Sequence, residues 1–347
     1  MKNKSYKQLT RKLIKNAILL TITALAVCAA PAVALADDIL CPNPYSTTWT
    51  GAINNNWFNS GNWTNGVPIC TPDVQYYALI PNGSPQINTG VAASACQASL
   101  AASSSTDSAT LSVYGSGSSL TTCSNTYVGY YGKGTLSITN GGAVTTQAVA
   151  SIASQPGSNG SATVDGTSTW TVVNELDVGG LTNASGGTGL LQVTNNGTVT
   201  VTAGGVHVYG SGTLAGKGTV STTSRTTIEG TLEPSSGRLT ISSGDLTFSG
   251  ITGPLMLSKV TPTSADNVYV SPGGAQLSGK LSVSMSGTFT PGTQFTLLHA
   301  DGGLGNTTFS SVSITYPTCQ CFTPKIQYDY LHNNVNLVLN PAPCCTQ

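Results

Sequence analysis

The sequence predicts an all-β fold, a single-stranded parallel β-helix (β-solenoid), from three observations. A self-similar phrase occurs twice within residues 111–208, and Val113 and Thr139 of the first copy match Val164 and Thr194 of the second. An interval of roughly 50 residues is typical of solenoids and propellers. Apolar residues alternate with Thr and Ser in short runs, which is the periodicity of strands. Gly, Asn-Gly or Gly-Gly ends each run, as expected where a turn needs a positive φ.

The two copies of the phrase contain strands too short for a propeller. The matching segments are residues 113–120, 127–129 and 134–144 in the first copy and residues 164–170, 177–179 and 189–199 in the second. A propeller blade has four longer strands, whereas strands of about three to six residues are at the short end of the usual range. Such strands bury an apolar stripe only when coil stacks on coil. Residues 181–188, rich in Gly, Asn and Ser, indicate a loop inserted in the second copy.

Residues 1–36 have the pattern of a secretory signal peptide. Six Lys or Arg lie in the first fifteen residues, an apolar run follows, and Ala34-Leu-Ala36 offers a small-residue cleavage site. The alternative is an uncleaved membrane anchor, which Pro31 and the cleavage site disfavour. No later stretch is apolar for the length of a membrane span, so we expect no transmembrane segment after cleavage.

Residues 37–106 are expected to form an N-terminal cap and the first coils. They hold three of the four Trp residues, including Trp57 and Trp63. A solenoid must cover the open edge of its first coil, and large amphipathic rings suit that role. The alternative is a carbohydrate platform, in which Trp57, Trp63 and Trp170 would expose their faces and stack on sugars.

The solenoid repeats are expected to fill residues 107–250, with further coils and a cap at residues 251–340 and a Cys-containing tail at residues 341–347. Apolar runs in the later part lie at residues 268–270, 275–283, 294–298, 326–330 and 335–339. Asn333-Asn334 between the last two runs indicates a turn. We therefore predict that the coils end in a hairpin that acts as a C-terminal cap.

Eight cysteines lie outside the signal peptide, in two groups of four with none between residues 123 and 319. They are Cys41, Cys70, Cys96, Cys123, Cys319, Cys321, Cys344 and Cys345. An even number in an exported chain indicates disulfides, and each group of four allows three pairings, which the sequence leaves open. The spacings do not match zinc knuckles. Intermolecular pairing at the tail would give a disulfide-linked oligomer.

The net charge disfavours two classes of partner. Without residues 1–36, seven basic and thirteen acidic residues remain, a net charge of −6. Nucleic acid and anionic membrane surfaces are both recognised by basic patches. We therefore expect neither as a partner.

The sequence shows no set of residues for catalysis. Carboxylates are scattered, and only Glu175 and Asp177 would share one strand face. We interpret this pair as part of a solvated outer face rather than as the two carboxylates of a glycosidase. Residues 163–170, which resemble the Asp-box of sialidases, are interpreted as a structural turn. We expect no catalytic residues, no cofactor and no metal site.

The repeat units resemble those of a known class of exported proteins. The units Val-x-Gly…Ser-x-Trp, Val-Gly and Gly-Thr-Leu-x-Ile…Asn-Gly-Gly stand at residues 164–170, 128–129 and 134–142. Over most of residues 45–340 the chain resembles the β-helical passengers of type V autotransporters and related exported bacterial repeat proteins. The resemblance implies a surface-exposed or released β-helix. Unlike those proteins, the chain is rich in Cys and shows no barrel strands after residue 340, so we do not expect export through its own barrel.

We therefore expect a non-catalytic, exported bacterial β-solenoid with a structural or adhesive role, on the cell surface, in the outer envelope or outer membrane, or secreted. Its contact surface would be a long face of Thr, Ser and Asn, and its partners surface glycans or other envelope proteins. The first alternative is a secreted carbohydrate-binding protein that uses exposed aromatic rings. The second is a polysaccharide-active enzyme, which needs two carboxylates converging in one groove.

Overall fold

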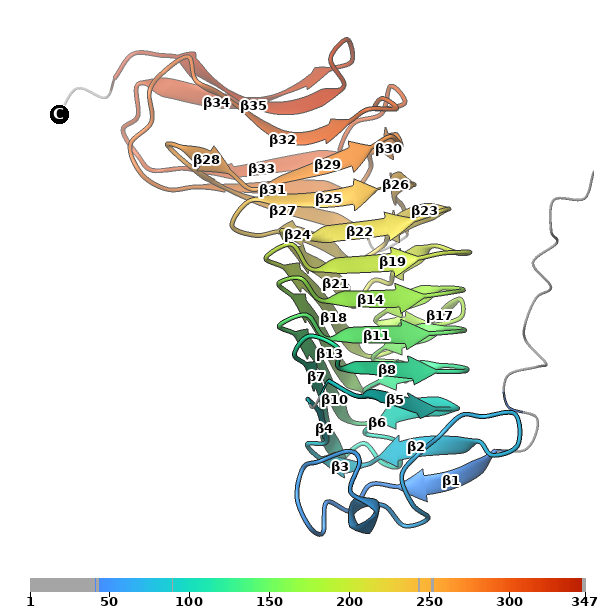
Figure 1. Cartoon of the computed structure of the whole chain (residues 1–347). Coiled ribbons are helices and arrows are strands. Elements are labelled where there is room, and N and C mark those ends of the chain that lie inside the picture. Colours follow the sequence, from blue (N-terminus) through green and yellow to red (C-terminus); the bar gives the residue numbers. More distant parts are fainter. Residues whose placement is uncertain (1–40, 42–43, 89, 243, 251–252, 345–347) are drawn as a thin grey trace, which may run out of the picture. The chain divides into compact units, whose positions relative to one another are not determined.

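The computed structural model describes residues 41, 44–88, 90–242, 244–250 and 253–344, which belong to one compact unit. The expected signal peptide lies outside the described residues, as does Cys345. Parallel strands account for nearly all of the structure, in a stack of coils (Figure 1). Among the described residues, the one helical element is the 3₁₀ turn η1 (Ser60–Asn62). The predicted β-solenoid is confirmed.

Three sheets run the length of the stack, because each coil contributes one strand to each sheet. Sheet 1 consists of β1 (Tyr45–Thr48), β2 (Tyr76–Ile80), β6 (Gln97–Leu100), β9 (Thr126–Val128), β12 (Ala150–Ile152), β15 (Leu176–Val178), β20 (Val206–Val208), β23 (Arg225–Ile228), β26 (Asp245–Phe248) and β30 (Ala275–Gln276). All of its paired strands are parallel.

Sheet 2 carries the longest strands of the repeats. It consists of β3 (Asn82–Gly83), β7 (Ser108–Tyr114), β10 (Lys133–Thr139), β13 (Asn159–Asp165), β18 (Thr188–Thr194), β21 (Gly212–Gly216), β24 (Thr231–Pro234), β27 (Leu255–Thr261), β31 (Lys280–Met285) and β33 (Ser311–Thr315), with β4 (Gln86–Ile87) on β7 and β28 (Ser264–Ala265) on β27. The prediction that residues 275–283 form a single strand is wrong. The segment divides between β30 in sheet 1 and β31 in sheet 2, with Gly279 at φ 71° between them.

Sheet 3 ends in the predicted hairpin. It consists of β5 (Ala92–Ala95), β8 (Ser119–Thr122), β11 (Ala143–Thr146), β14 (Thr169–Val172), β19 (Thr198–Val201), β22 (Thr219–Thr222), β25 (Arg238–Ser242), β29 (Asn267–Ser271), β32 (Gln294–Ala300), β35 (Asn334–Pro341) and β34 (Phe322–Asp329). Strands β34 and β35 pair antiparallel, and Asn333 takes the turn with φ 59°.

One coil of the regular part is about half of the interval between the two copies of the self-similar phrase. Ser108 pairs with Lys133 in the next coil, and Lys133 pairs with Asn159 in the coil after that. In the same way, Val113 pairs with Ile138, and Ile138 pairs with Val164. The interval from Val113 to Val164 therefore spans two coils. The phrase repeats every second coil, and the intervening coil carries a variant of it.

The core is a set of apolar columns inside the triangle of sheets. Leu111, Leu136 and Ala162 stack in register, and all three are buried. Alternate residues of each strand point outward, as the period of two predicts. Because each interior residue contacts its equivalents in the coils on either side, the coils stabilise one another by nearest-neighbour packing.

A hydroxyl network fills the corner between sheets 3 and 1. The Oγ1 atoms of Thr122 and Thr126 lie 2.9 Å apart, and those of Thr126 and Thr146 lie 2.8 Å apart. The indole of Trp170 is fully buried beside it and donates from Nε1 to Thr146 Oγ1 at 3.3 Å. Buried hydroxyls need partners, and here successive coils supply them to one another.

The Asn-Gly-Gly signature of the repeats has a steric cause. Asn140 and Gly141 take φ of 53° and 83°, and Asn and Gly tolerate this left-handed region. The next residue, Gly142, is needed for a different reason. A Cβ there would lie 2.3 Å from the carbonyl oxygen of Val113 in the preceding coil. The turn therefore sits too close to its neighbour for any side chain.

Three Trp residues pack together next to the first coils. The rings of Trp49 and Trp57 each meet Trp63 edge to face, at centroid distances of 5.1 and 4.8 Å. Trp63 Nε1 donates to the carbonyl of Trp57 at 2.8 Å. Burial in such a cluster is what a capping role would require.

Candidate functional site

The three Trp residues proposed as sugar-stacking platforms are buried. Trp57 and Trp170 are 0% exposed and Trp63 is 4% exposed. A ring must present a free face to stack on a sugar, and none of these does so in the structure. Among the exposed aromatic residues are Tyr45, at 65%, and Tyr131, at 42%, and the ring of Tyr131 meets that of Tyr130 edge to face at 4.6 Å.

The cysteines pair within their own groups. The disulfides are Cys41–Cys96, Cys70–Cys123 and Cys321–Cys344. The first two join the Trp-containing segment to the first coils, and the third joins the start of β34 to the residues after β35. The sequence predicts disulfides at both ends but leaves three pairings open in each group of four. The structure selects one of these for each bonded pair. Cys319 is exposed.

The outer face of sheet 3 carries two parallel columns of small, mostly hydroxylated side chains, which we call the threonine face. One column is Ser119, Ala143, Thr169, Thr198, Thr219 and Thr240, and the other is Thr121, Thr145, Thr171, Thr200, Ser221 and Ser242. Strands lie about 4.8 Å apart and alternate residues about 6.7 Å apart along each strand. Because the register is constant, the hydroxyls form a regular two-dimensional lattice.

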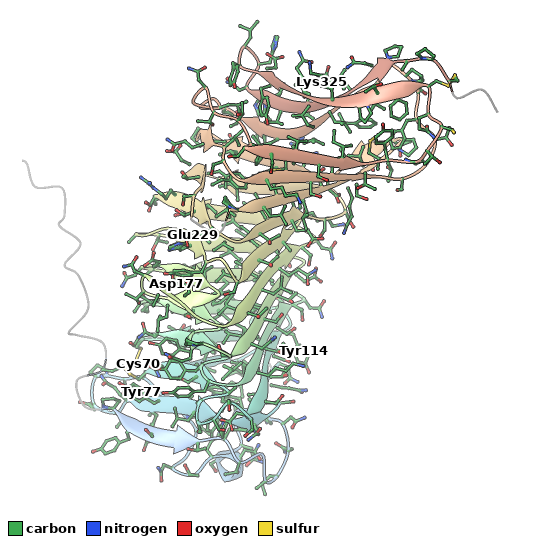
Figure 2. The ribbon with its side chains drawn as sticks, turned by 180° about the vertical axis from the view of Figure 1, so that it is seen from behind. Cys70, Tyr77, Tyr114, Asp177, Glu229 and Lys325 are labelled. Atoms are coloured by element: carbon green, nitrogen blue, oxygen red, sulfur yellow. A yellow bond between two sulfur atoms is a disulfide. The ribbon has the colours of Figure 1, made fainter. Side chains whose placement is uncertain are left out.

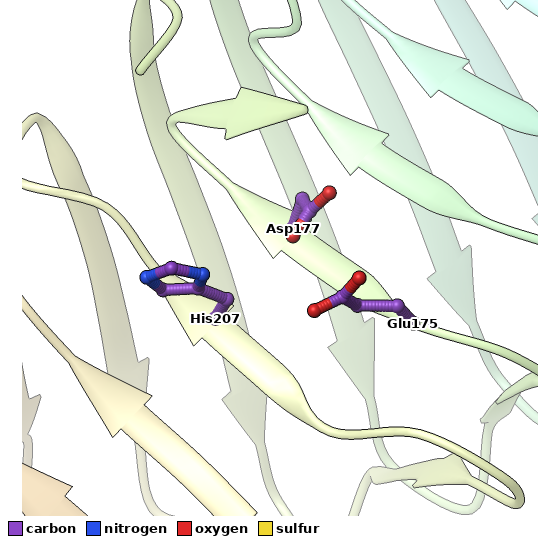
Figure 3. A group of neighbouring side chains, drawn as sticks. All are labelled: Glu175, Asp177 and His207. Atoms are coloured by element: carbon purple, nitrogen blue, oxygen red, sulfur yellow. The ribbon is translucent and has the colours of Figure 1, made fainter. Parts of the chain in front are cut away.

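A different column runs along the outer face of sheet 1. Its successive residues are Ser99, Tyr127, Ser151, Asp177, His207, Thr227 and Thr247. Asp177 and His207 are therefore neighbours in register, although a whole coil of sequence separates them. Glu175, two residues before Asp177, points to the same side (Figure 3).

A small hairpin covers the middle of this column. Strands β16 (Gly180–Leu181) and β17 (Ala184–Ser185) pair antiparallel within the predicted loop. Ser151 Oγ donates to the carbonyl of Gly180 at 2.6 Å, and the N–H of Thr182 donates to Asp177 Oδ2 at 2.7 Å. The hairpin thereby buries Asp177, which is 0% exposed despite its outward position. The expectation that Glu175 and Asp177 lie on a solvated outer face is wrong for Asp177.

Burial changes the acidity of Asp177. Desolvation raises the pKa of its carboxyl to about 6, more than the Thr182 hydrogen bond and the nearby His207 lower it. Desolvation likewise raises the pKa of Tyr209, whose hydroxyl accepts the N–H of Asn183 at 2.8 Å. The hairpin therefore creates a local environment of low polarity around an acid.

Glu175, Asp177 and His207 form one cluster. A ligand atom from each lies within 4.8 Å of the others (Figure 3). The imidazole of His207 stacks on the ring of Tyr209 at a centroid distance of 3.9 Å, and its Nε2 lies 3.1 Å from Glu229 Oε1. Figure 2 labels Asp177 and Glu229, which lie one level to either side of the strand that carries His207.

Sequence reasoning missed this cluster, although a signal for it exists. The tripeptides of sheet 1 share one pattern, with an apolar residue at each end and an outward residue between: Ala150-Ser151-Ile152, Leu176-Asp177-Val178 and Val206-His207-Val208. Alignment of these tripeptides coil by coil places Asp177 against His207. The cover over Asp177 has no such signal, because it comes from an inserted hairpin.

Asp165 behaves as a structural turn residue, as its interpretation within the Asp-box-like segment predicts. Its Oδ1 accepts from Thr194 Oγ1 at 2.7 Å and Asn195 Nδ2 at 2.6 Å in the next coil. The hydrogen bond from Thr194 is the main reason that the pKa of Asp165 is lowered. The carboxylate thus ties two successive turns together.

No family model matches this chain, and no curated protein matches its sequence. Within the described residues, no helix has the length and apolar character needed to cross a membrane.

Proposed function

We propose that this protein is a non-catalytic, exported structural or adhesive protein that makes contact through its threonine face. The observation that supports the proposal most is the constant register of that face over six successive strands of sheet 3. Such a face suits a partner that also repeats, such as a surface glycan or a layer of envelope protein.

The mechanism is the addition of many weak contacts. A hydroxyl that exchanges water for a partner gains only about 0.5–1.5 kcal/mol. Rigidly spaced contacts do not each carry the full entropic cost of association, so affinity grows with the number engaged. The side chains are short, and β-branched Thr has few rotamers to lose on binding.

The disulfides support export. Three disulfides within the described residues would be unusual in a reducing cytosol and are expected in an oxidising compartment. Fractionation of native cells, followed by immunoblotting with and without reductant, tests this part of the proposal. Mature chain in the outer envelope supports the structural or adhesive role, and a cytosolic chain would contradict export.

A pair of matched variants tests the threonine face itself. Thr171→Lys with Thr200→Lys places two charges at paired positions in the centre of the threonine face, whereas Ser137→Lys with Thr163→Lys places two charges at paired positions on the outer face of sheet 2. We expect only the first variant to lose binding of purified protein to isolated cell envelopes. Equal binding by both variants and the wild type would show that this face is not the contact surface.

The carbohydrate-binding alternative is tested at the exposed Tyr131. If sugars stack on this ring, Tyr131→Ala should abolish retention on a glycan array while the two Lys variants retain it. If Tyr131→Ala keeps retention on the array and the charges in the threonine face abolish it, the threonine face is supported as the contact surface.

A further inference from the structure

We propose that Glu175, Asp177 and His207 bind a divalent transition-metal ion of the zinc class beside the β16–β17 hairpin. The proposal does not depend on the threonine face, which belongs to another sheet. It assigns a binding site to the one part of the outer surface of sheet 1 that an insertion covers.

The first observation is a buried carboxylate oxygen without a partner. Asp177 is 0% exposed, and its Oδ2 is bound by the Thr182 N–H. Its Oδ1 has no hydrogen-bond partner among the described residues. Buried polar atoms are nearly always satisfied. A cation at this position would satisfy the carboxylate.

The second observation is the spacing of the donors. The three ligand atoms lie within 4.8 Å of one another. Donors of a tetrahedral zinc site, with bonds of about 2.0–2.2 Å, lie about 3.4 Å apart. The side chain of Glu175 is half-buried and can rotate, whereas Asp177 is held by the hairpin. No pair of these donors therefore has to approach by more than about 1.4 Å to reach the spacing of a zinc site.

The third observation is the support around the donors. The ring of Tyr209 stacks on His207 at 25° between the ring planes, and its hydroxyl is bound to Asn183 of the hairpin. Glu229 Oε1 lies 3.1 Å from His207 Nε2, and a carboxylate at one ring nitrogen is the usual support of an imidazole that binds a metal through the other. The imidazole is thus fixed by contacts from two directions before any ion arrives.

The donor types decide the class of ion. Ca²⁺ and Mg²⁺ prefer oxygen ligands in sets of six or more or in octahedra with water, and they rarely use imidazole. One imidazole with two carboxylates suits Zn²⁺ and its neighbours in the first transition series. Three protein donors leave one position of a tetrahedron for water or for a group of a bound partner.

The site would join two coils and the hairpin. Glu175 and Asp177 belong to the coil of β15, and His207 belongs to the coil of β20. An ion shared by them cross-links neighbouring levels of the stack, and it also neutralises the negative charge that Glu175 places beside the buried Asp177. We therefore expect binding to raise the melting temperature as well as to be measurable directly.

Titration calorimetry of the full mature chain with ZnCl₂, after dialysis against EDTA, tests the proposal. We expect one Zn²⁺ per chain at this site and no comparable binding of CaCl₂. His207→Gln and Glu175→Gln should weaken Zn²⁺ binding by at least about tenfold, and Glu229→Gln, which removes a supporting carboxylate, by about 10–100-fold. Each variant should also show a smaller Zn²⁺-dependent rise in melting temperature than the wild type at the same Zn²⁺ concentration.

The matched control is His299→Gln. His299 Nε2 lies 2.9 Å from Asp301 Oδ1 on sheet 3, so this change removes a different histidine–carboxylate pair. We expect it to leave Zn²⁺ binding unchanged. Absence of Zn²⁺ binding to the wild type, or equal binding by the wild type and a folded His207→Gln variant, would overturn the proposal. Far-UV circular dichroism establishes that each variant is folded.

Discussion

Replacement of Trp170 by Ala tests whether this indole belongs to the interior of the solenoid. The ring is fully buried, and Val144 and Val199 occupy the equivalent positions in the coils on either side. A buried aromatic side chain removes about 150–250 Å² from water. At about 25 cal/mol per Å² this corresponds to roughly 4–6 kcal/mol, which is an upper estimate because the unfolded chain is partly compact.

The measured range for Trp→Ala in protein cores, about 3–5 kcal/mol, is consistent with that figure. We therefore expect Trp170→Ala to lower the free energy of unfolding by about 3–5 kcal/mol in urea titrations followed by far-UV circular dichroism. Trp170→Phe keeps most of the apolar volume and loses the hydrogen bond to Thr146, so it should cost less. A loss below about 1 kcal/mol for Trp170→Ala would refute an interior role and would revive the sugar-stacking hypothesis.

Three further changes test local features. Gly142→Ala should lower the free energy of unfolding by about 1–3 kcal/mol, because its Cβ would lie 2.3 Å from the Val113 oxygen; a urea midpoint equal to that of the wild type would contradict the steric argument. Asp165→Asn should destabilise the chain by no more than about 1 kcal/mol at about pH 7, since the carboxylate is only half-buried and water screens it. Because the folded pKa of Asp165 is lowered, this difference should persist down to about pH 4 and be lost below it, as the pH falls through the folded pKa; a difference in thermal melts that remains at about pH 2 would argue against it. Replacement of Cys70 and Cys123 together by Ser should cost about 2–5 kcal/mol, and unchanged unfolding under non-reducing conditions would exclude a stabilising role for this disulfide.

The architecture could be predicted because the interior obeys a simple period. Leu136 and Ile138 are two positions apart and point inward. Each pairs with another buried apolar residue, Ala162 or Val164, in the next coil. The turn residues add a second signal, since Gly142 tolerates no side chain. Both signals act between residues that are close in sequence or one coil apart. They therefore appear in the sequence as alternation and repetition.

The cluster around Asp177 could not be predicted in full, because its decisive feature is an insertion. The pairing of Asp177 with His207 follows from the coil register. The burial of Asp177 follows from the fold of the hairpin over it, and a Gly/Asn/Ser-rich segment gives no indication of where it will lie. The pairing of the cysteines was also beyond the sequence, since three pairings are equivalent in each group until the coils are placed.

The two-coil period of the phrase makes the length of this protein adjustable in fixed steps. Duplication or deletion of one phrase would add or remove two strand spacings, about 9.6 Å, and would leave every remaining residue on the face it occupies now. Engineered chains of different length would then hold their two disulfide-linked ends at separations that differ by whole multiples of that step.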